Sequence, residues 1–291
     1  MTTGYTLTGS LADSLPTYIA SARNTRQYEG VMQQLCDRQT LDKNTGLNWA
    51  EITVANLTAQ PVTETTLLEN PQQLSDSMIS ITPTMIGVNI GITDRVKTRI
   101  SKVALAKTAG RTQAAIELKK DQDGLVALDG ATTSLCGAGN TLTSGHIGTA
   151  VFRITSNESE PGKLPINCVL HGYQIKDLYD EIIAAVGTYE ITQGETARAF
   201  REGFKGNING ARIFEDGNIT IDTSDDAKGG VFAKEGLILV QGRSPRVVTV
   251  RNEAYGGGAD IIYHYDEYAY GERSEGNWIY EIYSDATVPT S

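Results

Sequence analysis

The stretch "EAYGGGADIIYHYDEYAYGE", residues 253–272, sets three consecutive glycines before a run rich in tyrosine. A phosphate-binding loop places such glycines between a strand and a helix, so that backbone N–H groups at the helix N-terminus face the anion. Here β-branched and aromatic residues follow in strand-like alternation, and no Gly-Lys-Ser/Thr sequence is present. The stretch therefore predicts a bend at Gly256–Gly258 that leads into a long strand.

Composition narrows the class of protein. The 291 residues are 40% hydrophobic and 21% charged, which is typical of a soluble globular protein that buries a sizeable core. No apolar run is long enough to span a membrane, and the N-terminus does not resemble a secretion signal. Three widely spaced cysteines, Cys36, Cys136 and Cys168, suggest neither a disulfide framework nor a zinc site and favour a reducing cytoplasm.

The charge is acidic overall and unevenly distributed. A formal net charge of −10 argues against a protein that attracts nucleic acid. Residues 94–120 carry eight basic and two acidic residues, 8 − 2 = +6, whereas residues 251–291 carry two basic and eight acidic ones, 2 − 8 = −6. These segments are either solvated faces or surfaces that attract each other or a neighbouring copy.

Periodicity predicts an α+β fold without a regular βαβ alternation. Residues 86–92 alternate as a strand with one buried face, and a long helix is expected from about 94 to 119, with Gly110 marking a kink or close packing. Further helices are expected near residues 28–35, in "TSGHIGTAVFRITSN" and in "YQIKDLYDEIIAAVG", and a buried strand in "INCVL". The segment "GGVFAKEGLILVQGRS" fits a helix or a strand, and three strands close the chain.

Residues 37–76 are rich in threonine and asparagine and poor in hydrophobic residues. Such a segment is too long for an ordinary connection in a compact domain. With strand-like "EITV" and a turn signal at Asn44–Gly46, it predicts a protruding β-hairpin.

The search for chemistry assigns no catalytic, cofactor-binding or metal-binding residue. His146, His171 and His264 lack metal-ligand spacing, and no G-x-S-x-G elbow is present. The acidic "DTSDD", residues 222–226, lacks the glycine and terminal glutamate of a calcium loop and predicts a solvated turn.

The order of these parts resembles the major capsid protein of tailed bacteriophages, of the Hong Kong 97 (HK-97) fold. The resemblance rests on "SLPTYIASARNTRQYEGVMQQL", "PQQLSDSMISITPTMIGVNIGITDRV", "KKDQDGLVALDGA", "CVLHGYQIKDLYDEI" and "GGVFAKEGLILV" with the closing aromatic strands. It implies an N-terminal arm (1–36), an extended loop or E-loop (37–78), a peripheral domain (79–161) with a spine helix at about 94–119, an axial domain (162–245), and returning strands of the peripheral domain (246–291).

The resemblance also implies a function in assembly. Pentamers and hexamers of the chain would form an icosahedral shell, built in the host cytoplasm and present in the virion. The implied partners are further copies, portal and scaffold proteins, a decoration or cement protein, and packaged double-stranded DNA in weak contact, with no membrane and no cofactor. The scaffold would be a separate protein or a removed segment. The expected contacts between subunits are Lys43, Trp49, Glu51, Glu64, Arg95, Lys97, Arg99 and Lys102.

Two alternatives remain at this point. An encapsulin-like compartment shell shares the same fold but encloses cargo enzymes. An α+β enzyme would require a site that the sequence does not reveal.

Overall fold

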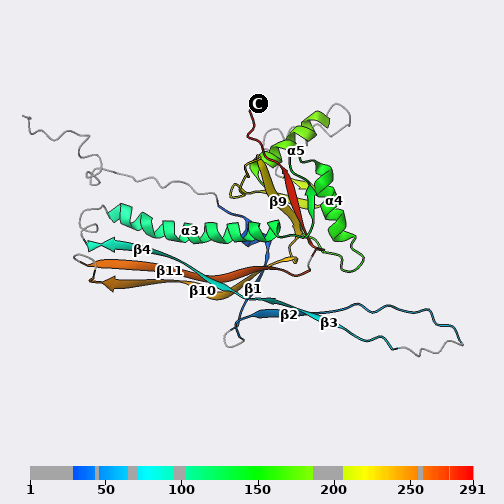
Figure 1. Cartoon of the computed structure of the whole chain (residues 1–291), viewed down its shortest axis with the longest axis horizontal. Helices are drawn as coiled ribbons and strands as arrows, with labels where there is room; N and C mark the ends of the chain where they lie inside the picture. Colours follow the sequence, from blue (N-terminus) through cyan, green and yellow to red (C-terminus); the bar gives the residue numbers. More distant parts are fainter. Residues whose placement is uncertain are drawn as a thin grey trace, which may run out of the picture. The chain divides into compact units, whose positions relative to one another are not determined.

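The computed structural model describes residues 29–42, 46–64, 71–94, 102–185, 206–254, 258–274 and 276–290, and only the backbone of 102–109 and 182–185. The protein mixes helices and strands, as predicted (Figure 1). Its chain divides into two compact units. The first unit comprises residues 1–29, 85–119 and 244–267, and the second comprises 30–84, 120–243 and 268–291.

Within the described residues the elements follow one another in this order: α1 (Met32–Leu35), β1 (Asp37–Thr40), β2 (Trp49–Val54), β3 (Asp76–Ile81), β4 (Thr84–Thr93), α3 (Lys102–Asp129), β5 (Ser134–Cys136), α4 (Ser144–Thr155), β6 (Ile166–Leu170), α5 (Gly172–Ala185), β7 (Asn207–Ile208), β8 (Ala211–Glu215), β9 (Asp226–Ala233), β10 (Leu237–Asn252), β11 (Ala259–Glu272) and β12 (Ile279–Asp285).

The second unit is built on a six-stranded sheet of order β5-β12-β9-β6-β8-β7. Strand β6, the predicted "INCVL", is buried along its whole length near the middle of this sheet. Figure 1 shows α4 beside β9, and its apolar face, with Ile147, Val151 and Ile154, packs into the same core as β6. His146, in the first turn of this helix, helps to cap its start, because its Nδ1 accepts a hydrogen bond from the Thr143 N–H at 3.2 Å.

One part of this sheet contains a parallel pair of strands joined through a helix, although the elements show no regular βαβ alternation. Strands β6 and β8 pair in parallel, with Ile166 opposite Ala211, and α5 lies between them in the chain. Parallel neighbours need such a crossover, because a tight turn can join only antiparallel strands. The fold therefore contains one local βαβ-type connection within an otherwise mixed sheet.

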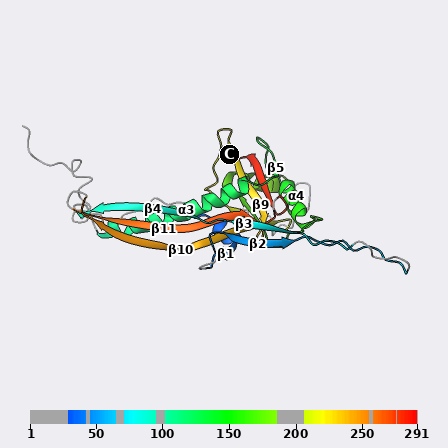
Figure 2. The same cartoon turned by 60° about the horizontal axis from the view of Figure 1, so that its bottom comes forward.

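The first unit combines most of β4 with parts of α3, β10 and β11. Strand β4 alternates as predicted: Ile86, Val88, Ile90 and Ile92 are half-buried or buried, and the residues between them are exposed. In Figure 2, α3 runs alongside β4 and β11. A contact of 3.0 Å between Thr112 Oγ1 and His264 Nε2 joins the helix to β11.

The glycine cluster leads into a strand, as predicted. Gly258 has a φ of +88°, a conformation that favours glycine, and β11 begins at the next residue. The carbonyl of Gly258 accepts a hydrogen bond from the Asp94 N–H at 3.0 Å. The remaining glycines of the cluster, residues 256 and 257, lie outside the described residues.

Four expectations about elements need correction or completion. Helix α3 extends to Asp129, ten residues beyond the predicted end near 119, because the buried row through Leu125 and Leu128 continues its apolar face. Gly110 lies inside this helix, and no described atom lies within 4 Å of a Cβ built on it, so of the two expectations, a kink or close packing, the second is wrong and the first stays a prediction. The ambiguous residues 229–244 form strands β9 and β10, and the helix near residues 28–35 spans only Met32–Leu35 among the described residues.

Candidate assembly interface

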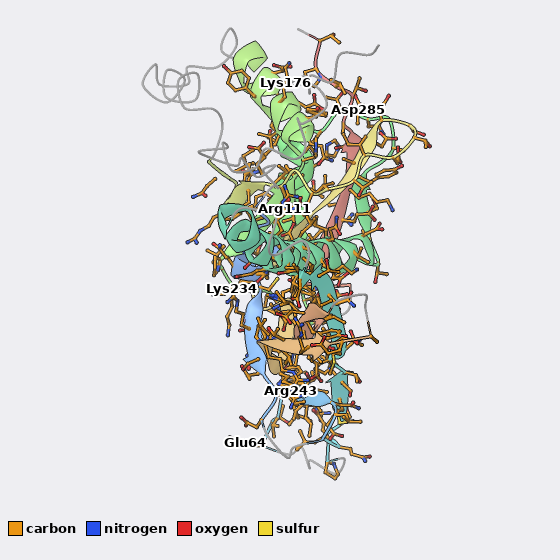
Figure 3. The ribbon with its side chains drawn as sticks, turned by 90° about the vertical axis from the view of Figure 1, so that its left-hand side faces the viewer. Glu64, Arg111, Lys176, Lys234, Arg243 and Asp285 are labelled. Carbon is orange, nitrogen blue, oxygen red and sulfur yellow. The ribbon has the colours of Figure 1, made fainter. Side chains whose placement is uncertain are left out.

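The β2–β3 hairpin predicted from residues 37–76 is present as an antiparallel pair. Trp49 lies opposite Ile81 and Val54 opposite Asp76. The pairing continues beyond the strands, because the Ala55 N–H donates to the Ser75 carbonyl at 2.9 Å. Figures 1 and 2 show that the segment after β2 and the segment before β3 continue side by side. Glu64, in the first of these segments, is labelled in Figure 3.

One face of the hairpin packs on its own unit. Trp49, Ile79 and Ile81 contact a small core that includes Ile238 and Val240 of β10. This contact is possible because β1 pairs in parallel with β10, which brings the start of the hairpin segment to that strand.

A charged cluster holds the base of the hairpin. Arg273, whose side chain is only 16% exposed, donates from Nε to Glu51 Oε2 at 2.8 Å and from Nη2 to Asp37 Oδ2 at 3.0 Å. Its Nη1 donates to the Glu235 carbonyl at 2.7 Å. Three directed hydrogen bonds from one planar guanidinium fix the orientation of β2 more strongly than a single ion pair would.

The opposite face of the hairpin is apolar and exposed. Ile52 lies opposite Met78, and their side chains are 62% and 67% exposed; Val54 beside them is 57% exposed. A two-stranded sheet with one apolar face in water is only marginally stable, so such a face is typically covered by a partner. Residues 46–81 also carry four acidic and no basic residues, 0 − 4 = −4.

The first unit presents a free strand edge. In the sheet order β1-β10-β11-β4, strand β10 has β11 on one side, and β1 pairs only with its residues 238–241 on the other. Residues 244–252 therefore have no strand partner on that side among the described parts of the chain. An unpaired edge of β-branched residues, here with Val247 59% and Val250 46% exposed, is a template for strand addition.

This edge of β10 is basic. Arg246 lies over the Tyr265 ring, 5.3 Å from its centroid, and Tyr265 stacks on Tyr263 at 5.8 Å. Arg251 is bound to Asp94 at 2.7 Å, and this hydrogen bond, with those to two further carboxylates, raises the pKa of its guanidinium. Arg251 is therefore engaged within the first unit, whereas Arg246 forms no ion pair among the described residues.

The residues expected to contact other subunits have different surroundings. Trp49 and Glu51 are engaged within the chain, by the core contact and by Arg273 respectively, and Glu64 is exposed. Lys102 opens α3 as described, without a described side chain. Lys43, Arg95, Lys97 and Arg99 lie outside the described residues. Whether any of them contacts a neighbour stays a prediction.

Neither the exposed apolar pair nor the free edge of β10 was predicted from the sequence. Both left a signal. "EITV" and "DSMISI" alternate, so that apolar residues fall on both faces of the hairpin, and "RVVTV" is a strand sequence next to a proline and an arginine. What the sequence did not disclose is which face the protein itself buries.

Other candidate features have structural roles. His264 bonds Thr112 and His171 lies edge-on to Tyr173, while Asp222 accepts hydrogen bonds from the Ser224 and Asp226 N–H groups in the predicted turn. No group of three His, Cys, Asp or Glu residues in the described part of the chain has the geometry of a metal site. No helix among the described residues is long and apolar enough to cross a membrane.

Comparison with known proteins identifies the fold. No protein-family model and no curated protein sequence matches the chain. Among solved structures, a chain of the head of Helicobacter pylori bacteriophage KHP40 matches with a TM-score of 0.74 at 12% identity, over 91% of this chain and 94% of that one. A chain of Mycobacterium phage Che8 matches with a TM-score of 0.70 at 16% identity, over 90% and 94%.

The likeness extends over nearly the whole chain. A chain from the capsid asymmetric unit of cyanophage Pam1 matches with a TM-score of 0.67 at 12% identity, over 99% of this chain and 100% of that one. The resemblance in fold that was predicted from the sequence is thereby confirmed. The chain has the α+β fold of phage capsid proteins.

Proposed function

We propose that the chain is the major capsid protein of a tailed phage, and that its copies assemble as pentamers and hexamers into an icosahedral shell around double-stranded DNA. The observation that carries this proposal is the match to phage capsid and head structures over nine-tenths or more of the chain, at TM-scores near 0.7. In this assignment residues 37–78 are the E-loop, α3 is the spine helix, and residues 162–245 are the axial domain.

The exposed surfaces suggest how neighbouring copies meet. The E-loop of one copy, with Ile52, Val54 and Met78 exposed and a net charge of −4, complements the basic, apolar edge of β10 near Arg246 on another copy. A contact between two different surfaces of identical chains is heterologous, so it can repeat around a ring and close a shell. Many such weak contacts per subunit stabilise the whole particle.

Partners follow from the same assignment. Portal and scaffold proteins would direct assembly, a decoration or cement protein could bind the finished particle, and the product is the capsid of the virion, built in the host cytoplasm. The net charge of −10 fits a wall that touches packaged DNA only weakly. Strong, steeply salt-dependent DNA binding by the purified protein would contradict this part of the proposal.

Electron microscopy tests the function directly. The protein would be imaged after expression alone and with its scaffold, and closed shells, pentamers or hexamers are the expected result. A persistent monomer under both conditions would overturn the proposal. The contents of the shell distinguish a phage capsid from an encapsulin-like compartment, since the first holds DNA and the second holds cargo protein.

A deletion tests the role of the E-loop. Removing residues 42–60 should leave a folded chain that no longer closes shells, because it removes β2 and with it the exposed face of the hairpin. Normal particles from this variant would refute the assignment of the E-loop while leaving the capsid function open to the test above.

A further inference from the structure

Two buried aspartates lie side by side in the second unit. Asp121, on α3, and Asp216, directly after β8, are both 0% exposed. They are 95 residues apart in sequence, 216 − 121 = 95, and neither belongs to the surfaces described above. Buried carboxyl groups without cationic partners are rare, because burial in a low dielectric disfavours the ionised form.

Four hydrogen bonds connect this pair to two segments. Asp121 Oδ1 accepts from the Met32 N–H at 3.1 Å, and Asp216 Oδ2 accepts from the Val31 N–H at 3.4 Å. Asn218 bridges the two carboxyls: its side-chain amide donates to Asp121 Oδ2 at 2.8 Å and its backbone N–H donates to Asp216 Oδ1 at 2.9 Å. The pair therefore supplies the acceptors for the start of α1, whose first N–H groups have no partners within the helix.

Gly30 shows how closely the chain approaches the pair. A Cβ built on Gly30 would lie 1.9 Å from Asp121 Cγ, so no other residue fits there without moving the carboxyl. The backbone of residues 30–32 is thus in direct contact with the carboxyl groups of Asp121 and Asp216.

The other ionisable groups around the pair come from α1, β1 and β11. The Cys36 thiol and the Tyr270 hydroxyl both interact with the charge of Asp121, and Arg38 lies near those two groups. Tyr270 Oη is buried with no hydrogen-bond partner among the described residues. No Lys or Arg forms an ion pair with either aspartate in the described part of the chain.

Burial, and secondarily the neighbouring charge of Asp121, raise the pKa of Asp216 to about 7. The two carboxyl groups are close enough for a protonated Asp216 to donate a hydrogen bond to Asp121. Once it is ionised, two like charges share a site from which water is excluded.

We propose that Asp121 and Asp216 form a proton-operated clamp on residues 30–36. A proton on Asp216 allows the two carboxyl groups to hydrogen-bond each other while they accept from the N–H groups of this segment, and loss of that proton favours release of the segment from the pair. The bistable element is the short stretch from Gly30 through α1, whose start is held by the hydrogen bonds of Val31 and Met32. Its far end is held separately, by burial of Leu35 and by a hydrogen bond of 3.1 Å from Asn167 Nδ2 to the Leu35 carbonyl. The clamp does not depend on the proposed capsid function.

The direction of the pH effect follows from linkage. The closed clamp binds the proton more tightly than an exposed aspartate of pKa ~3.9 does. Its opening equilibrium should therefore rise about tenfold per pH unit between roughly pH 4 and pH 7 and then level off. Acid closes the clamp, and neutral to alkaline pH loosens it.

Hydrogen exchange on the full-length chain measures this opening. Protection factors for a peptide covering residues 31–36, corrected for the intrinsic exchange rate, should fall about tenfold per pH unit up to about pH 7 and remain constant above it. A peptide from β6 serves as an internal control and should show no such step. A pH-independent protection factor for residues 31–36 would overturn the proposal.

A matched pair of variants identifies the titrating group. In Asp216→Asn, the amide can donate to Asp121 and accept from the Asn218 N–H, but it loses the bond of 3.4 Å from the Val31 N–H. Because the amide cannot titrate, the step should disappear. Asp225→Asn, an exposed aspartate with a φ of +62° that asparagine tolerates, should keep the wild-type step. A step that persists in Asp216→Asn would overturn the proposal. If this variant does not fold, the wild-type series with its β6 control decides.

Discussion

Ile52 and Met78 face each other across β2 and β3, and both side chains are more than three-fifths exposed. Cross-strand apolar pairs stabilise a sheet when a third layer covers them, and no described part of this chain covers this pair. The hairpin therefore leaves an apolar face open to a surface outside the chain, as the proposed assembly would need.

Replacing this pair should separate folding from assembly. The free energy of unfolding of the double variant Ile52→Ser and Met78→Ser should lie within about 0.5 kcal/mol of the wild-type value, because exposed positions contribute little to stability. Closed shells, counted by electron microscopy, should be lost. Val288→Ser, which removes another apolar side chain that is 57% exposed, is the matched control and should assemble normally. Normal shells from the double variant would show that this face is not an interface.

Reversing the charge at the edge of β10 should slow assembly. Arg246→Glu places an acidic group where the proposed acceptor meets the acidic E-loop, so light scattering should show slower growth of particles than in the wild type. The wild-type rate should itself fall as salt rises, because exposed charges are screened. Lys234→Glu, in the turn between β9 and β10, is the control for net charge. Equal rates for the two variants would argue against a contact at this edge.

Arg273 should matter more for stability than an exposed ion pair. Arg273→Lys keeps the charge but cannot make all three hydrogen bonds, so the free energy of unfolding in urea should drop by about 1–3 kcal/mol. Lys176→Ala removes the exposed pair with Asp180, 2.6 Å long and within one turn of α5, and should cost no more than about 0.5 kcal/mol. Figure 3 labels Lys176 on this helix. Equal losses would mean that Arg273 does not anchor the hairpin.

Two glycines in strands should respond in opposite ways to alanine. A Cβ at Gly229, in β9, would lie 2.4 Å from the Val169 carbonyl oxygen, so Gly229→Ala should destabilise by roughly 1–3 kcal/mol. Gly91, in β4, has open space around its Cα, and Gly91→Ala should stabilise by up to about 1 kcal/mol through the entropy of the unfolded chain. Thermal unfolding distinguishes the two, and a loss at Gly91 comparable to that at Gly229 would contradict the packing described here.

The three cysteines should differ in reactivity. Burial raises the pKa of the Cys36 and Cys168 thiols. It also makes both thiols inaccessible to reagents in the folded protein. Cys136 is partly exposed, and burial together with Asp177 and Asp226 raises its pKa. Iodoacetamide at pH 8 should therefore label Cys136 alone, more slowly than a free cysteine and faster as the pH rises. All three should react in urea, as mass spectrometry can show, and native labelling of Cys168 would contradict the position of β6 in the core.

Much of the fold was readable from local patterns. The alternation of β4, the apolar stripe of α4 and the buried run of β6 each follow from side chains that must reach one core, and the structure confirms all three. The strand after the glycine cluster was equally readable, because glycine at Gly258 and β-branched residues after it favour that conformation.

What the sequence could not decide are relations between residues that are distant in the chain. The sequence did not show that β1 pairs with β10 or that residues 229–244 form strands. It also did not show that Arg273 forms hydrogen bonds to the base of a hairpin more than 200 residues earlier in the chain. Nor did it place Asp121 beside Asp216. Local periodicity reports which side of an element is apolar, whereas the partner of that side depends on long-range packing and buried hydrogen bonds. Sequence patterns therefore determined the elements and the family resemblance, and the tertiary structure decided which surfaces remain open and which acids are buried together.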